Sequence, residues 1–122
     1  MAVPDRRLTR DGHEMTMGIN HFGHFYLTYK LWHLIRESNS PRVINLSSSA
    51  HRMNGPDYKI DPENIFYQNG GYAPWVAYSA SKLANILFTK ELQRRMDESR
   101  MNGVSISVHP GVVRTELVRH MA

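Results

Sequence analysis

The chain has 122 residues, of which 41% are apolar and 21% charged, and this is the composition of a folded domain rather than of a disordered segment. It has no cysteine, so disulfides, thiolate metal sites and catalysis by a thiol are excluded. The net charge of +4 comes from dispersed basic residues without a basic stripe interleaved with aromatic residues, so we expect no nucleic-acid partner.

No apolar run approaches the ~18 residues that a membrane-spanning helix needs. The segment from Met1 to Arg10 also lacks the apolar stretch of a signal peptide. As written, the sequence predicts one soluble domain over residues 1–122.

The first predicted element is a long amphipathic helix over about 13–36, with Thr9 or Asp11 available to cap it. Its apolar and aromatic residues recur at spacings of three and four. They are Met15, Ile19, Phe22, Phe25, Tyr26, Tyr29, Trp32, Leu34 and Ile35. We interpret Phe22, Phe25 and Trp32 as core or helix-packing residues rather than a ligand cage. Gly18 and Gly23 lie inside the pattern and indicate close packing or a kink.

A short, β-branched stretch at 42–46 follows, and it predicts a buried strand that runs into the three serines at 47–49. We interpret Asn45 within it as a structural hydrogen-bonding residue rather than a catalytic one. From 50 to 74 the sequence is polar, rich in glycine, proline, asparagine and tyrosine, and without sustained periodicity. A segment of this length without regular structure is usually functional, so we expect a surface excursion near the site.

A second helix is predicted over 77–96, and a second short strand over 104–108. The order helix, strand, helix, strand is typical of α/β proteins, and it predicts parallel strands joined by a right-handed crossover. Ligands of such sheets bind outside the carboxyl ends of the strands. The serines after the first strand and His109 to Thr115 after the second should therefore converge with the start of the second helix.

Tyr78 and Lys82 are the most informative pair in this region. Residues i and i+4 share a helix face, so the ammonium group of Lys82 should lie beside the phenol of Tyr78. A neighbouring cation favours the phenolate form, which suits a phenol to general acid/base catalysis. The spacing alone occurs by chance in many helices, and the converging strand ends are what make it informative.

With these residues in place, the chain resembles the short-chain dehydrogenase/reductase family, and within it the retinol dehydrogenases. Four motifs carry the resemblance in the family's order and span nearly the whole chain. They are Asn20-His21-Phe22-Gly23-His24-Phe25, Arg42-Val43-Ile44-Asn45-Leu46-Ser47-Ser48, Tyr78-Ser79-Ala80-Ser81-Lys82-Leu83-Ala84-Asn85 and His109-Pro110-Gly111-Val112-Val113-Arg114-Thr115-Glu116-Leu117. The resemblance implies the C-terminal part of a Rossmann-like, doubly wound parallel sheet, incomplete here.

The resemblance also implies catalytic roles for individual residues. Tyr78 would exchange a proton with the substrate oxygen, and Lys82 would bond the nicotinamide ribose. Ser48 would hold the substrate oxygen, with Ser47 as the alternative, and Asn20 would order a proton-relay water beside Lys82.

The resemblance further implies a set of residues that would lie along the nicotinamide, and these follow the second predicted strand. They are Pro110, Gly111, Val113 and Thr115, and the cofactor-binding set also includes Tyr78 and Lys82.

The sequence departs from the family pattern at both ends. It has no glycine-rich turn of the kind that receives a dinucleotide pyrophosphate, so we expect a fragment that keeps the catalytic half. The preference for NADP(H) over NAD(H) rests on the resemblance alone. Full-length relatives are often at the endoplasmic reticulum membrane, whose anchor this sequence does not encode.

The leading hypothesis is an NADP(H)-dependent oxidoreductase that interconverts an apolar alcohol, such as a retinoid, with its aldehyde or ketone. Two alternatives stay open: a carbonyl or steroid reductase of the same family, and a catalytically silent fragment that acts through protein binding or self-association. His21 and His24 have helical spacing, but no third ligand accompanies them clearly, so we expect no metal site.

Overall fold

Two five-residue strands, β1 (Arg42–Leu46) and β2 (Val104–Val108), form a parallel sheet in the computed structural model, which describes residues 2–111 and 113. Their register pairs Arg42 with Val104 and Leu46 with Val108. Both strands lie at the predicted residues, and the parallel pairing confirms the predicted α/β order. The carboxyl ends of the two strands therefore meet at one edge.

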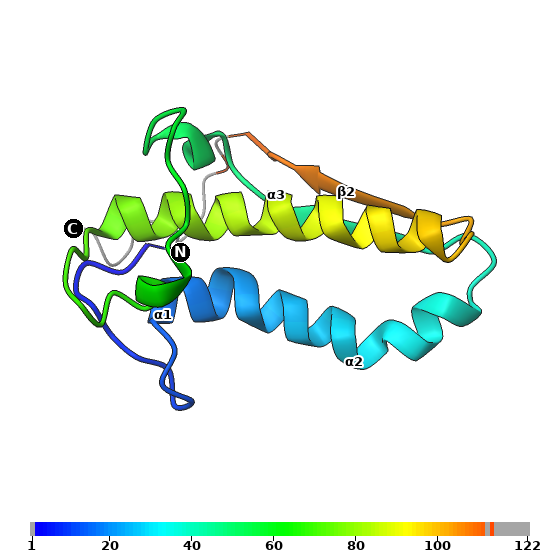
Figure 1. The fold of residues 1–122 in the computed structure, drawn as a ribbon, viewed down its shortest axis with the longest axis horizontal. Helices are drawn as coiled ribbons and strands as arrows, with labels where there is room; N and C mark the ends of the chain where they lie inside the picture. Colours follow the sequence, from blue (N-terminus) through cyan, green and yellow to red (C-terminus); the bar gives the residue numbers. More distant parts are fainter. Residues whose placement is uncertain (1, 112, 114–122) are drawn as a thin grey trace.

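The connection between the strands contains helix α3 (Pro74–Glu98), which packs on one face of the sheet (Figure 1). Pro74 occupies the first helical position, where its missing N–H costs nothing. The amide Nδ2 of Asn45 in β1 donates to Thr89 Oγ1 in α3 over 2.9 Å, and both residues are buried. This hydrogen bond fixes the helix against the strand and agrees with a structural role for Asn45.

The predicted first helix is divided by a wide turn. Helix α1 (Met15–Met17) continues into a π-helical segment, η1 (Gly18–Phe22), and then into α2 (Gly23–Glu37). The amide of Gly23 donates to Gly18 O, which is the i to i+5 bond of a π-turn. A Cβ on Gly18 would lie 2.8 Å from Thr9 Cγ2, so this glycine marks close packing.

The cap of this helix is Glu14, so the prediction of Thr9 or Asp11 was wrong. The buried Glu14 carboxylate accepts hydrogen bonds from the amides of Thr16 at 2.7 Å and Met17 at 2.8 Å. A carboxylate at this position also complements the positive end of the helix dipole. Thr9 instead accepts a hydrogen bond from the amide of His13 in the preceding loop.

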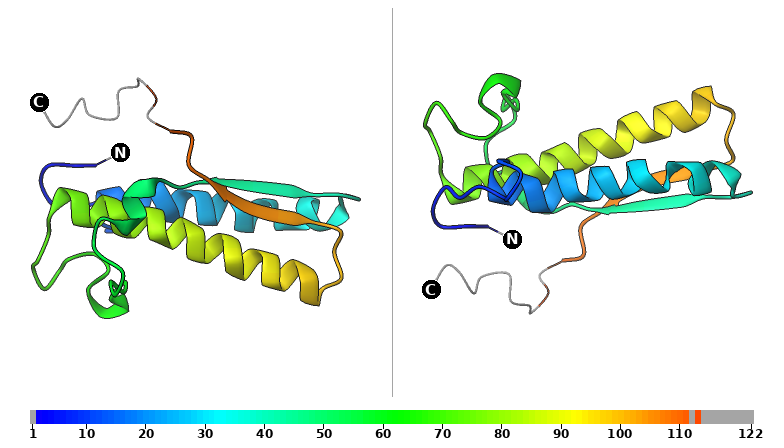
Figure 2. Two further views of the ribbon diagram at one scale, coloured as in Figure 1. Left: turned by 90° about the horizontal axis from the view of Figure 1, so that it is seen from above. Right: turned by 90° about the horizontal axis from the view of Figure 1, so that it is seen from below.

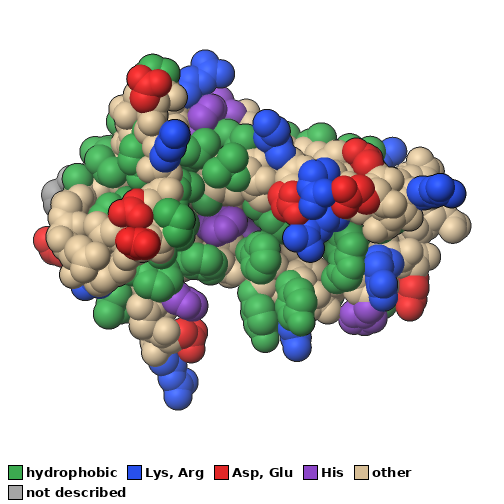
Figure 3. Space-filling view, viewed as in Figure 1, with side chains coloured by type: hydrophobic (Ala, Val, Ile, Leu, Met, Phe, Trp, Pro, Cys, Tyr) green, Lys and Arg blue, Asp and Glu red, His purple; other side chains and the backbone are tan. Residues whose placement is uncertain are grey.

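Helix α2 runs alongside α3, as Figures 1 and 2 show, and none of its residues is buried. The two helices meet through aromatic rings, with the centroids of Phe25 and Phe88 5.1 Å apart. A groove of about 450 Å³ lies between them. The amphipathic pattern therefore predicts the helix correctly, but its apolar residues remain largely on the surface, where Figure 3 shows hydrophobic side chains gathered between and below the helices.

The excursion contains only two short 3₁₀ turns, η2 (Ser49–Arg52) and η3 (Pro62–Asn64). Tyr72 Oη at its end donates to Val3 O over 2.5 Å, and Phe66 packs edge-on against Phe22. Its residues Tyr58, Ile60 and Ile65 cover a small core made of Met17, Ala80 and Ala84. The excursion thus packs around α1 and the first half of α3.

The second face of the sheet is apolar and open in the described residues. Ile44, Leu46, Val104 and Ile106 are between 44% and 59% exposed there. Because a doubly wound parallel sheet carries helices on both faces, the observed arrangement is that of an incomplete Rossmann-like fold. None of the described helices combines the length and the apolar character that a membrane span requires.

Candidate active site

Tyr78 and Lys82 lie one turn apart on α3, and their side chains meet. Lys82 Nζ is 5.5 Å from the centroid of the Tyr78 ring. The Tyr78 side chain is nearly buried, with 6% of its surface exposed, and the ring of Trp75 packs edge-on against it at 5.8 Å. The i, i+4 spacing therefore produces a confined phenol–ammonium pair with an aromatic wall.

The ammonium group of Lys82 faces the end of β1. Its Nζ donates to Leu46 O at the long distance of 3.4 Å, and partial burial lowers the pKa of Lys82 below its ordinary value. Within the described residues, ion pairs join only Glu91, Arg94, Arg95 and Glu98, so Lys82 has no carboxylate partner there. An ammonium group has three donors, and this one therefore retains donors for a ligand.

The two candidate serines have different environments. Ser47 is buried, and its hydroxyl donates to Lys82 O over 2.8 Å, while its amide donates to Val108 O in the neighbouring strand. Ser48 is half-buried, and its oxygen accepts from the amide of Ala50 at 3.2 Å as the cap of η2. A hydroxyl oxygen that accepts a hydrogen bond can still donate its own proton, so Ser48 is the serine with a donor to offer.

Asn20 reaches the site from the π-turn η1. Its Nδ2 donates to Ser81 Oγ over 3.1 Å, and Ser81 Oγ in turn donates to Tyr78 O over 2.7 Å. Asn20 and Ser81 are both buried. The wide turn thus connects the first helical region to the peptide of Tyr78.

The residues expected beside the nicotinamide follow β2. The bond between the Ser47 amide and Val108 O brings the start of this segment next to β1, and Pro110 and Gly111 come directly after. Gly111 has a positive φ of 82°, with open space where a Cβ would be. Val113 is 54% exposed, and Thr115 lies outside the described residues.

Asn85 belongs to this constellation, although sequence reasoning gave it no role. It lies on α3 three residues after Lys82 and seven after Tyr78, so it shares their helix face. Its Nδ2 donates to Asn20 O and to Leu46 O, both at 2.9 Å. The spacing from Tyr78 was the signal that could have identified it.

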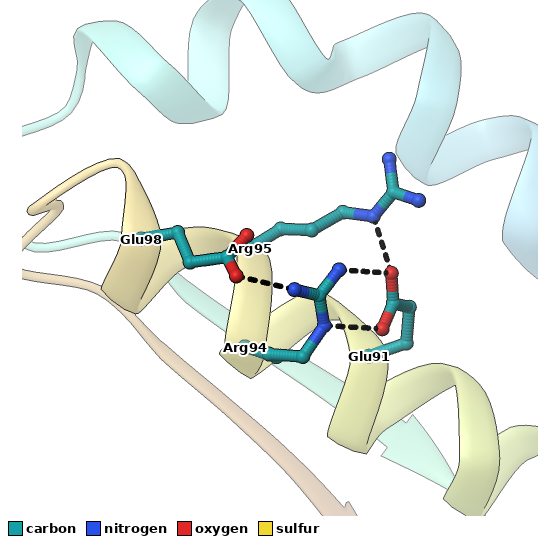
Figure 4. A network of polar contacts seen from close by, with 4 residues as sticks. All are labelled: Glu91, Arg94, Arg95 and Glu98. Carbon is teal, nitrogen blue, oxygen red and sulfur yellow. Dashed lines mark hydrogen bonds and ion pairs between the residues drawn. The ribbon is translucent and has the colours of Figure 1, made fainter.

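The strongest charge cluster lies at the other end of α3, away from Tyr78. Arg94 bonds Glu91 and Glu98, and Arg95 bonds Glu91 (Figure 4). Hydrogen bonds from Arg94 and Arg95 lower the pKa of Glu91 to about 2. These arginines are therefore engaged within their own helix. In the described part of the chain, no group of three or more histidine and acidic side chains is arranged to hold a metal.

The described residues fit the nicotinamide-ribose part of a dinucleotide. The weakly engaged ammonium of Lys82 supplies donors of the kind that ribose hydroxyls accept, and the backbone at Gly111 leaves open space for close approach. The described residues contain no glycine-rich turn between a strand and a helix that could receive a pyrophosphate. The described residues therefore match the nicotinamide-ribose half of a dinucleotide and supply no turn for its pyrophosphate.

Known proteins resemble this chain over nearly its whole length. Human retinol dehydrogenase 13 is 48% identical over 113 residues, and human retinol dehydrogenase 11 is 46% identical over 112 residues; each match covers 92% of the chain. The chain spans about a third of the length of these curated relatives, 32% and 33% respectively. No family model matches it.

Solved structures show the same fold. An uncharacterized protein from Mycobacterium paratuberculosis superposes with a TM-score of 0.79 at 38% identity, covering 98% of this chain and 42% of that one. A short-chain dehydrogenase from Streptomyces avermitilis superposes with a TM-score of 0.57 at 22% identity, covering 96% of this chain and 38% of its own, and it supports the fold alone. The resemblance expected from the four motifs is confirmed.

Proposed function

The chain belongs to the short-chain dehydrogenase/reductase family, and we propose that it carries the catalytic residues of an NADP(H)-dependent oxidoreductase for apolar alcohols and their aldehydes or ketones. The observation that supports this proposal most is the Tyr78–Lys82 pair, with Lys82 Nζ 5.5 Å from the phenol ring at the end of β1. The choice of NADP over NAD rests on the resemblance to retinol dehydrogenases.

A bound nicotinamide supplies or accepts the hydride, and the protein handles the proton and the charge. Tyr78 Oη gives a proton to the substrate oxygen during reduction and takes it back during oxidation. Lys82 donates to the ribose hydroxyls and keeps a positive charge beside the phenol. Ser48 Oγ donates to the substrate oxygen, where negative charge develops during reduction.

Asn20 has a supporting place in this scheme. Its carboxamide donates to Ser81 Oγ, which in turn donates to the main-chain carbonyl of Tyr78, so Asn20 is linked to the main chain of the proposed proton donor. We assign to it the ordering of a water that passes protons between Lys82 and solvent.

Trp75 suggests the chemical class of substrate. It is 40% exposed and packs against the ring of Tyr78, so an apolar surface borders the proposed proton donor. An apolar alcohol or aldehyde would bury part of this indole surface on binding. The relatives named retinol dehydrogenase make a retinoid the first substrate to try.

The test is steady-state reduction of retinaldehyde with NADPH by the protein expressed from its complete gene. Tyr78→Phe should abolish turnover with an unchanged circular dichroism spectrum, because only the proton donor is lost. Tyr26→Phe is the matched control, since it removes a hydroxyl from a tyrosine that is 59% exposed on α2. Equal turnover by Tyr78→Phe and the parent would refute the mechanism.

A second candidate function is binding to another protein without catalysis. It is favoured by the open apolar face of the sheet and by α2, where Tyr26, Leu27 and Tyr29 are more than half exposed. Titration of the purified 122-residue chain with NADPH separates the candidates. Micromolar binding supports the oxidoreductase, and millimolar or absent binding supports the silent fragment. Comparing retinaldehyde with steroid and small carbonyl substrates tests the remaining alternative within the family.

A further inference from the structure

Asn85 is a buried carboxamide whose hydrogen-bonding groups all have partners. Only 3% of its surface is exposed. Its two Nδ2 hydrogens match two backbone carbonyls, Asn20 O and Leu46 O, each 2.9 Å away. Its Oδ1 lies 3.0 Å from His21 Nδ1. One side chain therefore joins the π-turn η1, the last residue of β1 and helix α3.

The two carbonyls fix the orientation of the amide group. A backbone carbonyl only accepts hydrogen bonds, so the Asn85 NH₂ group must face them and Oδ1 must face His21. His21 consequently donates from Nδ1. The ring of His21 is held among aromatic neighbours, with the centroids of Phe22 and Phe25 at 5.3 and 6.1 Å. Three hydrogen bonds, to Asn20 O, Leu46 O and His21 Nδ1, therefore hold the Asn85 carboxamide in place.

One of those carbonyls is also a partner of Lys82. Leu46 O accepts from Asn85 Nδ2 at 2.9 Å and from Lys82 Nζ at 3.4 Å. The shorter bond, from Asn85, fixes the position of the Leu46 carbonyl. The longer bond, from Lys82, holds the ammonium group only weakly. Ser47 and Ser48 follow Leu46 directly, so their positions also depend on the carbonyl that Asn85 fixes.

We propose that Asn85 is a positioning residue of the active site. Its carboxamide fixes the main-chain carbonyl of Leu46, which Lys82 Nζ contacts, and the main-chain carbonyl of Asn20, and so fixes the position of Asn20 itself. This inference rests on the proposed oxidoreductase function. Without Asn85, Leu46 O would lose its short donor and Lys82 Nζ would become its remaining side-chain partner. The ammonium group would then be drawn away from the ribose position. Asn85 touches neither substrate nor cofactor in this scheme, so its effect falls on the geometry of the residues that do.

The test compares Asn85→Leu with Thr89→Val in the protein expressed from its complete gene. Both changes keep the approximate side-chain shape and remove a buried hydrogen bond between α3 and β1, which is Asn85 Nδ2 to Leu46 O in one case and Asn45 Nδ2 to Thr89 Oγ1 in the other. Asn85→Leu also removes the bonds to Asn20 O and His21, and Thr89→Val also removes the bond within α3 to Asn85 O. We expect Asn85→Leu to lower kcat with NADPH and retinaldehyde by about tenfold or more, as displaced catalytic groups do, with little change in KM for retinaldehyde. Thr89→Val should lower the thermal unfolding midpoint by less, because fewer buried hydrogen bonds are lost, and should leave kcat near that of the parent.

A second readout needs no turnover. In protein labelled with ¹³C at leucine carbonyls and free of cofactor, the Leu46 carbonyl resonance should move upfield in Asn85→Leu, because the carbonyl loses its short donor. It should stay in place in Thr89→Val. An unmoved Leu46 resonance in folded Asn85→Leu would overturn the inference.

The outcomes separate this inference from the proposed function. Turnover by the parent, none by Tyr78→Phe and parental kcat in folded Asn85→Leu would overturn the positioning role alone. No turnover by the parent, or undiminished turnover by Tyr78→Phe, would overturn both. If Asn85→Leu does not fold, Asn85→Asp decides, since it keeps the side-chain shape and the acceptor for His21 Nδ1 but replaces the NH₂ group that donates to Asn20 O and Leu46 O. A lower kcat with unchanged KM supports the inference, and an unchanged kcat overturns it.

Discussion

The hydroxyl of Ser47 donates to the main-chain carbonyl of Lys82 over 2.8 Å. This bond joins the residue that follows β1 to the turn of α3 that carries the candidate catalytic lysine. The Ser47 hydroxyl proton is used in this bond, whereas in the described part of the chain the Ser48 hydroxyl oxygen is engaged only as an acceptor for the amide of Ala50. The two adjacent serines therefore have separable tasks.

Substitution of these serines should separate stability from activity. Ser48→Ala should lower kcat by about a hundredfold, which is typical of losing one donor to a developing oxyanion, with a small change in stability. Ser47→Ala should lower the free energy of unfolding by about 1 kcal/mol, the usual cost of one buried hydrogen bond, with a smaller effect on kcat. Urea unfolding and steady-state kinetics on both variants measure this, and a reversed pattern would assign the substrate oxygen to Ser47.

Gly18 tests the close packing that accompanies the π-turn. Gly18→Ala should destabilise the protein by about 1–3 kcal/mol, because the added methyl group would lie 2.8 Å from Thr9 Cγ2. Thr9→Ser removes Cγ2 and keeps the oxygen that accepts from the amide of His13.

The double variant Thr9→Ser/Gly18→Ala should therefore recover most of the lost stability. A double-mutant cycle by urea unfolding measures the coupling. Strictly additive effects would show that Thr9 is not the group that limits the space at Gly18.

The Glu91 cluster should give the stability of the protein a component that disappears in acid. Hydrogen bonds from Arg94 and Arg95 lower the folded-state pKa of Glu91 from 4.5 to about 2. Because the folded pKa is the lower one, the contribution is complete above pH 4.5 and is lost as the pH falls towards 2.

Thermal unfolding of the parent and of Glu91→Gln between pH 7 and pH 2 measures this component. The difference between the two midpoints should shrink across that interval and should also shrink with added salt. Glu37→Gln is the control, because this exposed carboxyl at the end of α2 makes no ion pair in the described part of the chain. A constant difference from pH 7 to pH 2 would contradict the assignment.

Lys82 should be necessary for activity and dispensable for folding. Burial lowers its pKa, so its charged form is less favourable in the folded protein than in the unfolded chain. Lys82→Met should abolish turnover and change the thermal midpoint at pH 7 by no more than a few degrees, since the lost contact with Tyr78 is worth only about 0.5–1 kcal/mol. A large fall in the midpoint would show that Lys82 is a structural residue.

The regular elements could be predicted because their signals are local. β1 and β2 are short, β-branched stretches ending in loops, and both occur at the predicted residues. α3 begins at Pro74 and ends at Glu98, a little beyond the predicted bounds. The i, i+4 spacing was enough to place Lys82 against Tyr78, since both lie on one rigid helix.

What depends on distant contacts could not be predicted. Two glycines signalled an irregularity in the first helix, but only packing against Thr9 shows why Gly18 is required. The cap was assigned to the wrong residue because Glu14 is selected by its burial, which the sequence does not display. The task of Ser47 is set by a carbonyl 35 residues away, and the role proposed for Asn85 depends on three elements at once.

The measurement that tests the central claim most directly is deuterium transfer from NADPH labelled at the reactive C4 hydrogen to retinaldehyde. The protein expressed from its complete gene should place the label on the alcohol carbon of retinol, and Tyr78→Phe should not. Transfer that is equal in the two proteins, or absent from the parent although it binds NADPH, would contradict the assignment of Tyr78 as the proton donor of a hydride-transfer site.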